Sequence, residues 1–201
     1  MINLQGKSPK LLMLGDLMID HYLWGSCDRI SPEAPVQVVN IKSENLTLGG
    51  AGNVIKNLTT LGAQVDAISV IGECATSKEL IELLKKIKLD TRYLITQQDR
   101  ITSRKSRIIS DQQQVVRYDR ESTDEISNKS QITIIEIFKE IVGNYDVILL
   151  SDYGKGVLTF ELTQSLISIA NKEDKKILVD PKGLDFSKYK GAYLITPNKK
   201  E

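Results

Sequence analysis

The segment Leu48-Gly49-Gly50-Ala51-Gly52-Asn53 is the most informative part of this 201-residue sequence. Three of its positions are glycine, and the residues that follow, 54–61, have apolar side chains at helical spacing. Gly62 then supplies a residue suited to ending that helix. Unpaired N–H groups at a helix start favour oxygen-rich ligands, and glycine allows a close approach. The segment is therefore typical either of a ligand-binding turn or of a plain glycine turn before an ordinary helix.

Composition limits the classes of function. Lysine and arginine number 27 against 26 aspartates and glutamates, so no overall charge attracts nucleic acid or a membrane surface. Cys27 and Cys74 lack metal-ligand spacing and His21 is the single histidine, which argues against a zinc cluster. We expect both cysteines to be buried, reduced thiols. The apolar runs are of strand length and residues 1–8 lack a signal-peptide core, so we expect a soluble, cytoplasmic protein.

Most of the chain alternates between strand and helix patterns. Thr76 and Glu79 form a T-x-x-E pattern that predicts a capped helix running to about residue 88. Such alternation, with helices of ten or more residues, predicts a parallel sheet joined by crossover helices. The expected strands are 10–14, 65–72, 146–150, 176–179 and 192–195, and the further helices are 130–142 and 159–171.

Polar residues follow several of the expected strands. Asp16 and Asp20 come after the first strand, and Asp152 and Lys155 follow the strand 146–150. Open α/β sheets bind ligands at the carboxyl ends of their strands, so these side chains indicate a functional rim. The alternatives are turn capping for Asp16 and simple solvent exposure for Asp20.

Two segments depart from the alternation and predict a separate flap. Residues 36–42 read as a half-exposed strand, and residues 102–110 and 115–119 read as two strands around a polar turn at 111–114. Period-two geometry places Lys105 and Arg107 on one face. Neighbouring cations repel unless an anion or acids lie between them. A bound phosphate group is one interpretation, and a solvated basic hairpin is the other.

The motifs and their order resemble the ribokinase-like (PfkB) carbohydrate kinases. The resemblance rests on Gly15-Asp16-Leu17-Met18-Ile19-Asp20, the glycine segment 49–53 and Asn198-x-x-Glu201, and it covers residues 10–201. Within the family, the sequence is most similar to kinases of D-glycero-β-D-manno-heptose 7-phosphate. The residues that carry this narrower similarity are 29–36, Gln113-Gln114, 151–156 and 179–183.

The resemblance implies a doubly wound, mostly parallel sheet with a small β lid, formed by strands near 34–46 and 100–120. The chain 1–201 would be the N-terminal part of one kinase domain, because it stops at a helix start with the C-terminal part of the fold missing. The implied reaction moves the ATP γ-phosphate to the anomeric hydroxyl of the heptose 7-phosphate and gives the 1,7-bisphosphate. That step belongs to ADP-heptose and lipopolysaccharide core biosynthesis.

The resemblance also assigns roles to individual residues. Sugar hydroxyls would be held by Asp20, Gly49, Gly50 and Asn53, with Asp16 as a further candidate. The 7-phosphate would be held by Lys105 and Arg107, beside the rim residues Asp152 and Lys155 and a second phosphate candidate, Lys182. Asn198 and Glu201 match the family motif associated with the ATP phosphates and, indirectly, with Mg²⁺.

Three further expectations follow from the resemblance. The catalytic general base would lie beyond Glu201, so the 201-residue chain alone should have no kinase turnover. The lid would pair with the lid of a second subunit, giving a homodimer. The alternatives are a kinase of the same family acting on another sugar or a nucleoside, and a non-catalytic sugar-binding or dimerisation fragment.

Overall fold

Six parallel strands form the central sheet of the computed structural model, which describes residues 8–199. Their order is β10-β9-β8-β1-β4-β5, and every neighbouring pair is parallel. The α/β class predicted from the strand–helix alternation is thereby confirmed. The strands are β1 (Lys10–Gly15), β4 (Gln64–Gly72), β5 (Leu94–Gln97), β8 (Val147–Ser151), β9 (Lys176–Asp180) and β10 (Leu194–Ile195).

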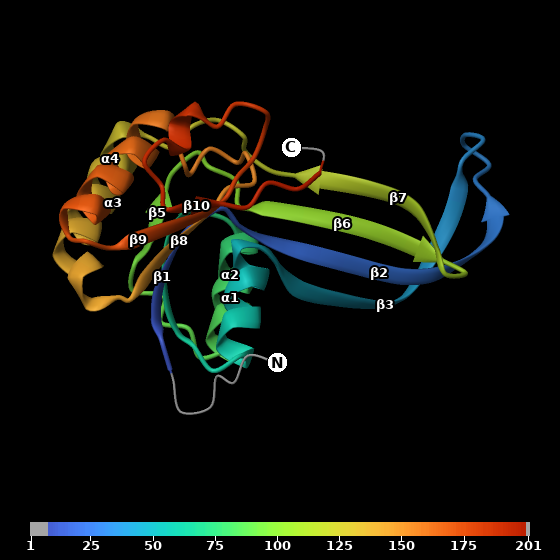
Figure 1. Cartoon of the computed structure of the whole chain (residues 1–201). Helices are drawn as coiled ribbons and strands as arrows, with labels where there is room; N and C mark the ends of the chain where they lie inside the picture. The colour runs from blue at the N-terminus through green and yellow to red at the C-terminus, as the bar shows by residue number, and fades with distance from the viewer. Residues whose placement is uncertain (1–7, 200–201) are drawn as a thin grey trace.

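Helices cover both faces of this sheet (Figure 1). Side chains of β1 alternate between two hydrophobic clusters, because successive strand residues point to opposite faces. Leu12 and Leu14 pack in the cluster that contains Phe138, whereas Met13 packs in the cluster that contains Ile55. The helices are α1 (Ala51–Thr60), α2 (Ala75–Lys86), α3 (Asn128–Ile141) and α4 (Phe160–Lys172), with short 3₁₀ turns at Val142–Asn144 and Ser187–Tyr189.

A second sheet projects from the body as a long, flat flap, which we call the lid (Figure 1). Its order is β3-β2-β6-β7, formed by β3 (Gln37–Gly50), β2 (Leu17–Ile30), β6 (Ser103–Ser110) and β7 (Gln113–Arg120). The sequence patterns indicated no strand at 17–30. β2 continues almost directly from β1, with only Asp16 between the two strands, so one run of chain crosses from the body into the lid.

The glycine segment is the return crossing from lid to body. Gly50 ends β3 and is the N-cap of α1, with φ of 54° and ψ of −137°. A Cβ at Gly50 would lie 2.7 Å from the carbonyl oxygen of Asp16, which itself accepts a hydrogen bond from the N–H of Ala51 at 3.1 Å. Glycine is required here because both the backbone angle and the close approach exclude a side chain.

The predicted T-x-x-E cap of α2 is wrong. The helix begins one residue before Thr76, its N-cap is Cys74, and no side chain caps it. Glu79 instead forms an ion pair with Arg104 of the lid strand β6. A partner from a different part of the chain has therefore replaced the local capping contact that the sequence pattern indicated.

Both cysteines are free and half-buried, so the expectation of buried thiols is also wrong. Burial would raise the pKa of the Cys74 thiol, but hydrogen bonds from Ser77 and Thr102 outweigh it and lower the pKa to about 7. We expect iodoacetamide to alkylate Cys74 in a Cys27→Ala background with a rate that rises through a midpoint near pH 7. Ser77→Ala should move that midpoint upward. A midpoint near the ordinary value of 9.0 in the unchanged site would contradict the prediction.

Candidate functional site

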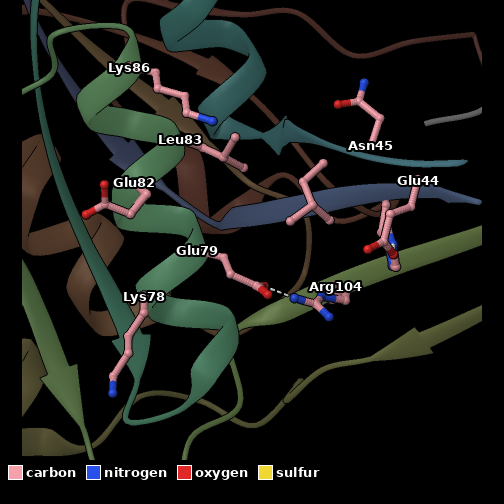
Figure 2. Close-up of a pocket in the computed structure, with 10 residues that line it drawn as sticks. Glu44, Asn45, Lys78, Glu79, Glu82, Leu83, Lys86 and Arg104 are labelled. Atoms are coloured by element: carbon pink, nitrogen blue, oxygen red, sulfur yellow. Dashed lines mark hydrogen bonds and ion pairs between the residues drawn. The ribbon is translucent and has the colours of Figure 1, made fainter.

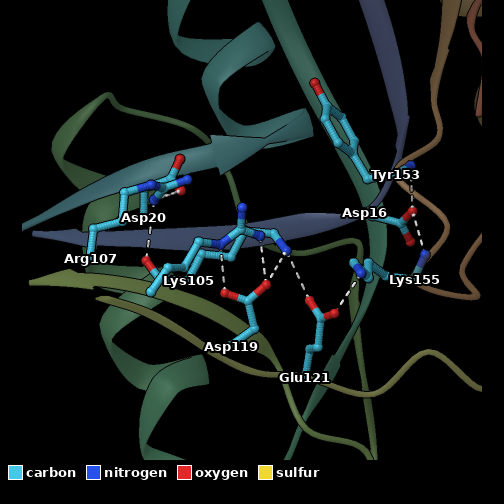
Figure 3. A network of polar contacts seen from close by, with 9 residues as sticks. Asp16, Asp20, Lys105, Arg107, Asp119, Glu121, Tyr153 and Lys155 are labelled. Carbon is cyan, nitrogen blue, oxygen red and sulfur yellow. Dashed lines mark hydrogen bonds and ion pairs between the residues drawn. The ribbon is translucent and has the colours of Figure 1, made fainter. Parts of the chain in front are cut away.

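Several of the predicted site residues lie where the lid joins the body, among them Asp20, Lys105 and Arg107 (Figure 3). Asp20 of β2 lies beside Lys105 of β6 in the parallel register of the lid, and Arg107 lies one step further along the same face. The loop that follows β8 faces them from the body and carries Lys155. The arrangement brings together residues that are more than 130 positions apart in the sequence.

Arg107 forms an ion pair with Asp20 across the two strands. Its Nη1 donates to Oδ1 of Asp20 at 2.6 Å, and the two side chains are 21% and 22% exposed. The guanidinium also lies over the ring of Tyr22, 5.3 Å from its centroid. The carboxylate predicted to hold sugar hydroxyls is therefore bound to a cation predicted to hold phosphate.

Lys105 lies between two carboxylates, that of Asp119 in β7 and that of Glu121 just after the strand. Its Nζ lies 3.1 Å from both Asp119 Oδ2 and Glu121 Oε2. Glu121 reaches across to the body, where its Oε1 lies 2.6 Å from Nζ of Lys155. Acids therefore separate the lid cations, which removes the repulsion expected between bare neighbouring charges.

The neighbouring cations lower the pKa values of Asp119 and Glu121. Burial would raise the pKa of Glu121, but the ammonium groups of Lys155 and Lys105 outweigh it and hold the pKa below its usual value. The pKa of Asp119 is lowered by hydrogen bonds from Arg117 and then Lys105. Both acids are thus stabilised in the ionised form by the same ammonium group, that of Lys105.

Asp16 has a different environment from Asp20. It is 1% exposed, and its carboxylate accepts backbone N–H groups of the loop after β8. The donors are Tyr153 at 2.8 Å, Lys155 at 3.1 Å and Val157 at 3.2 Å. Burial raises the pKa of Asp16, and these donors act in the opposite direction. In this conformation Asp16 holds the loop. Its buried carboxylate is occupied by these N–H groups and is not available to a sugar hydroxyl.

Arg100 holds the same loop from the carbonyl side. The residue is 7% exposed, and its guanidinium donates to the carbonyl oxygens of Asp124 and Lys155. Burial lowers the pKa of Arg100, while the charges of Asp16 and Asp124 oppose the shift. The backbone around Lys155 is therefore fixed from two sides. The Asp16 carboxylate accepts hydrogen bonds from its N–H groups, and the Arg100 guanidinium donates to the Lys155 carbonyl group.

Asp152 is also committed to neighbouring groups. It is 3% exposed, and its carboxylate accepts hydrogen bonds from the N–H of Gly154 at 2.7 Å and the hydroxyl of Tyr189 at 2.8 Å. Lys188 pairs with the same carboxylate at 2.5 Å. Lys182 follows β9 and is exposed, and its N–H donates to the Tyr189 hydroxyl at 3.1 Å. Asp152 thus joins two rim loops.

The glycine segment contributes space beside Asp20. A Cβ on Gly49 would lie 2.5 Å from Oδ2 of Asp20, so a side chain at this position would push the carboxylate away from where it lies. Asn53 lies in the first turn of α1 and is exposed. Asn53 and Asp20 both lie close to the glycine segment, and no described contact joins the two side chains.

The nucleotide and metal assignments lie at the end of the chain. Asn198 follows β10 and is exposed, and Glu201 lies outside the described residues. Within residues 8–199, no three His, Cys, Asp or Glu side chains gather as a metal site. In the same range, no helix is long and apolar enough to span a bilayer.

Sequence reasoning missed Asp119, Glu121 and Arg100. Asp119 and Glu121 are two positions apart, as are Lys105 and Arg107, and this matching spacing across a hairpin was the available signal. Arg100 gave no local signal, because its partners are the backbone carbonyls of Asp124 and Lys155.

A separate pocket of about 610 Å³ lies between α2 and the opposite face of the lid (Figure 2). His21 and Arg104 line it because they alternate with Asp20 and Lys105 along β2 and β6. His21 is buried, with Nδ1 3.2 Å from the Ser106 hydroxyl and Nε2 3.0 Å from Glu44. The pocket does not reach the candidate site.

A mostly parallel α/β sheet with a β lid over its rim defines the ribokinase-like class. Among solved structures, the crystal structure titled Sa239 matches with a TM-score of 0.73 and 19% identity, covering 96% of this chain and 62% of that one. Ribokinase of Arabidopsis thaliana, complexed with ribose and ATP, matches with a TM-score of 0.67 and 15% identity, covering 96% and 61%. Likenesses at this identity establish the fold alone.

The chain belongs to the pfkB family of carbohydrate kinases, whose family model matches residues 8–201. It is similar to the bifunctional protein HldE of Aliarcobacter butzleri, with 63% identity over 97% of this chain and 41% of that protein. HldE of Campylobacter fetus is 56% identical over 95% of this chain and 41% of the relative. The chain thus spans about two fifths of the length of these curated relatives.

Proposed function

We propose that this chain forms the sugar-phosphate side of a kinase that phosphorylates the anomeric hydroxyl of D-glycero-β-D-manno-heptose 7-phosphate. The product would be the 1,7-bisphosphate of the ADP-heptose and lipopolysaccharide core pathway, made in the cytoplasm. The observation that carries the proposal is the convergence of Asp20, Lys105 and Arg107 on one face at the root of the lid. The similarity to HldE proteins supports the choice of a heptose.

The chemistry of these groups suits such a ligand. A carboxylate accepts hydrogen bonds from two sugar hydroxyls in fixed directions, as Asp20 would. Ammonium and guanidinium groups bind phosphate through charge-assisted hydrogen bonds, as Lys105 and Arg107 would. Gly49 and Gly50 leave the sugar close to the backbone, with Asn53 beside them. The loop held by Asp16 and Arg100 presents Lys155 to the same space.

ATP and Mg²⁺ would be the other components of the reaction. Mg²⁺, when bound, neutralises charge on the transferred phosphoryl group. Asn198 and Glu201 are the proposed contacts to the nucleotide side. None of the residues named in this proposal is assigned as the general base, and we expect the 201 residues by themselves to bind the sugar phosphate weakly and to show no turnover.

The exposed apolar side chains of the lid support a homodimer. Several large apolar side chains are exposed on its two faces and along its edges, and exposed apolar surface of this kind favours a partner. A second copy of the lid is the partner that we propose. The exposed residues are Trp24, Ile30, Val36, Ile41, Val115, Val116 and Tyr118.

Lys105→Met tests the phosphate contact. We expect the variant to bind heptose 7-phosphate at least about tenfold more weakly, because a hydrogen bond to a charged group contributes roughly 1.5–3 kcal/mol. Its affinity for the unphosphorylated heptose should change little. NMR titration of the chain suits the weak binding expected and reports whether the amides of Gly49 and Lys105 shift.

Lys139→Met is the matched control, because Lys139 is exposed in the last turn of α3, on the body. It should leave both affinities unchanged. Equal binding of the two sugars by the unchanged chain would contradict a 7-phosphate site and favour a kinase for another sugar or a nucleoside. If neither sugar shifts the site amides, the result would favour a dimerisation fragment.

A further inference from the structure

The ion pair between Arg107 and Asp20 joins two groups to which the proposed function gives different ligands. We infer that this pair makes the site selective, because a phosphate group on the substrate must first engage Arg107 before Asp20 is free to bind sugar hydroxyls. The inference rests on the proposed function and adds a specificity-determining role for the pair itself.

The geometry shows that the pair closes both subsites at once. Nη1 of Arg107 lies 2.6 Å from Oδ1 of Asp20, which is the distance of a charge-assisted hydrogen bond. The second oxygen, Oδ2, packs against the backbone of Gly49, where a Cβ would come within 2.5 Å. A sugar hydroxyl therefore meets a carboxylate that is already paired with a cation through Oδ1 (Figure 3).

A neutral sugar and a sugar phosphate differ in how they can open this pair. A hydroxyl offers Asp20 a neutral donor in exchange for a cation, which is a poor exchange. A phosphate dianion offers Arg107 a stronger partner than one carboxylate and can draw it away. The Arg107 guanidinium also lies over the Tyr22 ring, 5.3 Å from its centroid, and this contact does not involve Asp20.

The other site cations are likewise held by acids in this structure. Lys105 lies 3.1 Å from both Asp119 and Glu121, and Lys155 lies 2.6 Å from Glu121. These pairs leave the proposed sugar carboxylate untouched, so among the ion pairs of residues 8–199 only that between Arg107 and Asp20 couples the phosphate subsite to the hydroxyl subsite. The site would discriminate in two ways. It would bind the phosphate of the right substrate, and it would make an unphosphorylated sugar break the Arg107–Asp20 pair without compensation.

Arg107→Met tests the inference because it removes the cation and frees Asp20. We expect the variant to bind heptose 7-phosphate at least about tenfold more weakly and, in contrast, to bind the unphosphorylated heptose about fivefold more tightly than the unchanged chain. A simple loss of a phosphate contact would weaken the first affinity without strengthening the second. NMR titrations measure both, and the spectrum confirms folding.

Arg117→Met is the matched control. Arg117 lies directly opposite Arg107 on the neighbouring strand β7, and its guanidinium pairs with Asp119 at 2.6 Å instead of with Asp20. The variant makes the same change of charge on the same face of the lid. It should not increase the affinity for the unphosphorylated heptose.

Inorganic phosphate supplies a test that needs no variant. If phosphate opens the pair, saturating phosphate should increase the affinity of the unchanged chain for the unphosphorylated heptose, by the reciprocity of coupled binding. Arg107→Met should abolish that increase. No gain from either the variant or phosphate would overturn the inference while the proposed function stands. Absence of any preference for the phosphorylated sugar in the unchanged chain would overturn the proposed function, and the inference with it.

Discussion

Replacement of Asp16 by alanine should lower the free energy of unfolding by about 3–5 kcal/mol, which is the range for breaking a buried charged contact. The carboxylate is 1% exposed and accepts backbone N–H groups from Tyr153, Lys155 and Val157. Alanine would leave these donors without their acceptor and would remove one of the two nearby charges, those of Asp16 and Asp124, that compensate Arg100. Urea unfolding at pH 7 measures the loss.

Asp20→Ala is the control that makes the result specific. Asp20 belongs to the same Gly-Asp-x-x-x-Asp motif, but its side chain is 22% exposed and has one strong partner, Arg107. Its removal should cost about 1 kcal/mol or less, as for other partly exposed ion pairs. Equal losses from the two substitutions would contradict the distinct roles assigned to Asp16 and Asp20.

Hydrogen exchange separates loop release from general destabilisation. In a folded Asp16→Ala variant, the amides of Tyr153, Lys155 and Val157 should exchange faster than those of the sheet core, because their acceptor has gone. Asp20→Ala should leave these three amides protected. Uniform acceleration over the whole chain would mean that Asp16 supports the fold without specifically holding the loop.

The body of the fold could be predicted from local sequence patterns. Strands such as Val147–Ser151 are apolar runs of strand length, and helices such as α4 carry an apolar stripe beside a side-chain cap at Thr159. β2 could not be recognised in this way. Its first residues continue the apolar run of β1, and its later part is exposed, so neither a buried run nor a clear alternation marks it.

The cations of the lid could be predicted, but their partners could not. Alternation alone placed Lys105 and Arg107 on one face, as the lid register has them. The turn of the hairpin is Asp111–Gln112, both with positive φ, and not the whole of 111–114. A four-residue turn would have set Lys105 opposite Arg120, whereas the two-residue turn together with the bulge between Ile108 and Ile109 sets it opposite Asp119. One residue of slip changes which charges share a face.

The contacts of Asp16 could not be predicted for a different reason. Its partners lie 137 to 141 positions further along the chain, in a loop that no local pattern relates to the first strand. Knowing that both segments end neighbouring strands, β1 and β8, is the minimum needed to place them together. The spacing of the motif could therefore indicate a functional rim without separating the acid that faces the site from the acid that supports it.

Gly50→Ala should lower the free energy of unfolding by about 2–3 kcal/mol, because alanine is strained at this backbone angle and meets a fixed neighbour. The φ of Gly50 is 54°, and a Cβ there would lie 2.7 Å from the carbonyl oxygen of Asp16. That oxygen cannot retreat freely, since it accepts the N–H of Ala51 at 3.1 Å. Thermal and urea unfolding should agree on the loss.

Gly52→Ala makes the same chemical change two residues later and should have nearly the opposite effect. Gly52 is inside α1, where alanine is favoured over glycine by roughly 0.5–1 kcal/mol. Its Cβ would meet the side chain of Leu48 at 3.3 Å, which must give by a few tenths of an ångström, and that of Leu17 at 3.7 Å, an ordinary contact. We therefore expect a change between neutral and about 1 kcal/mol stabilising. Comparable destabilisation by Gly50→Ala and Gly52→Ala would mean that the segment needs small residues throughout. A loss confined to Gly50 would locate the requirement at the single residue where the lid strand turns into the body helix.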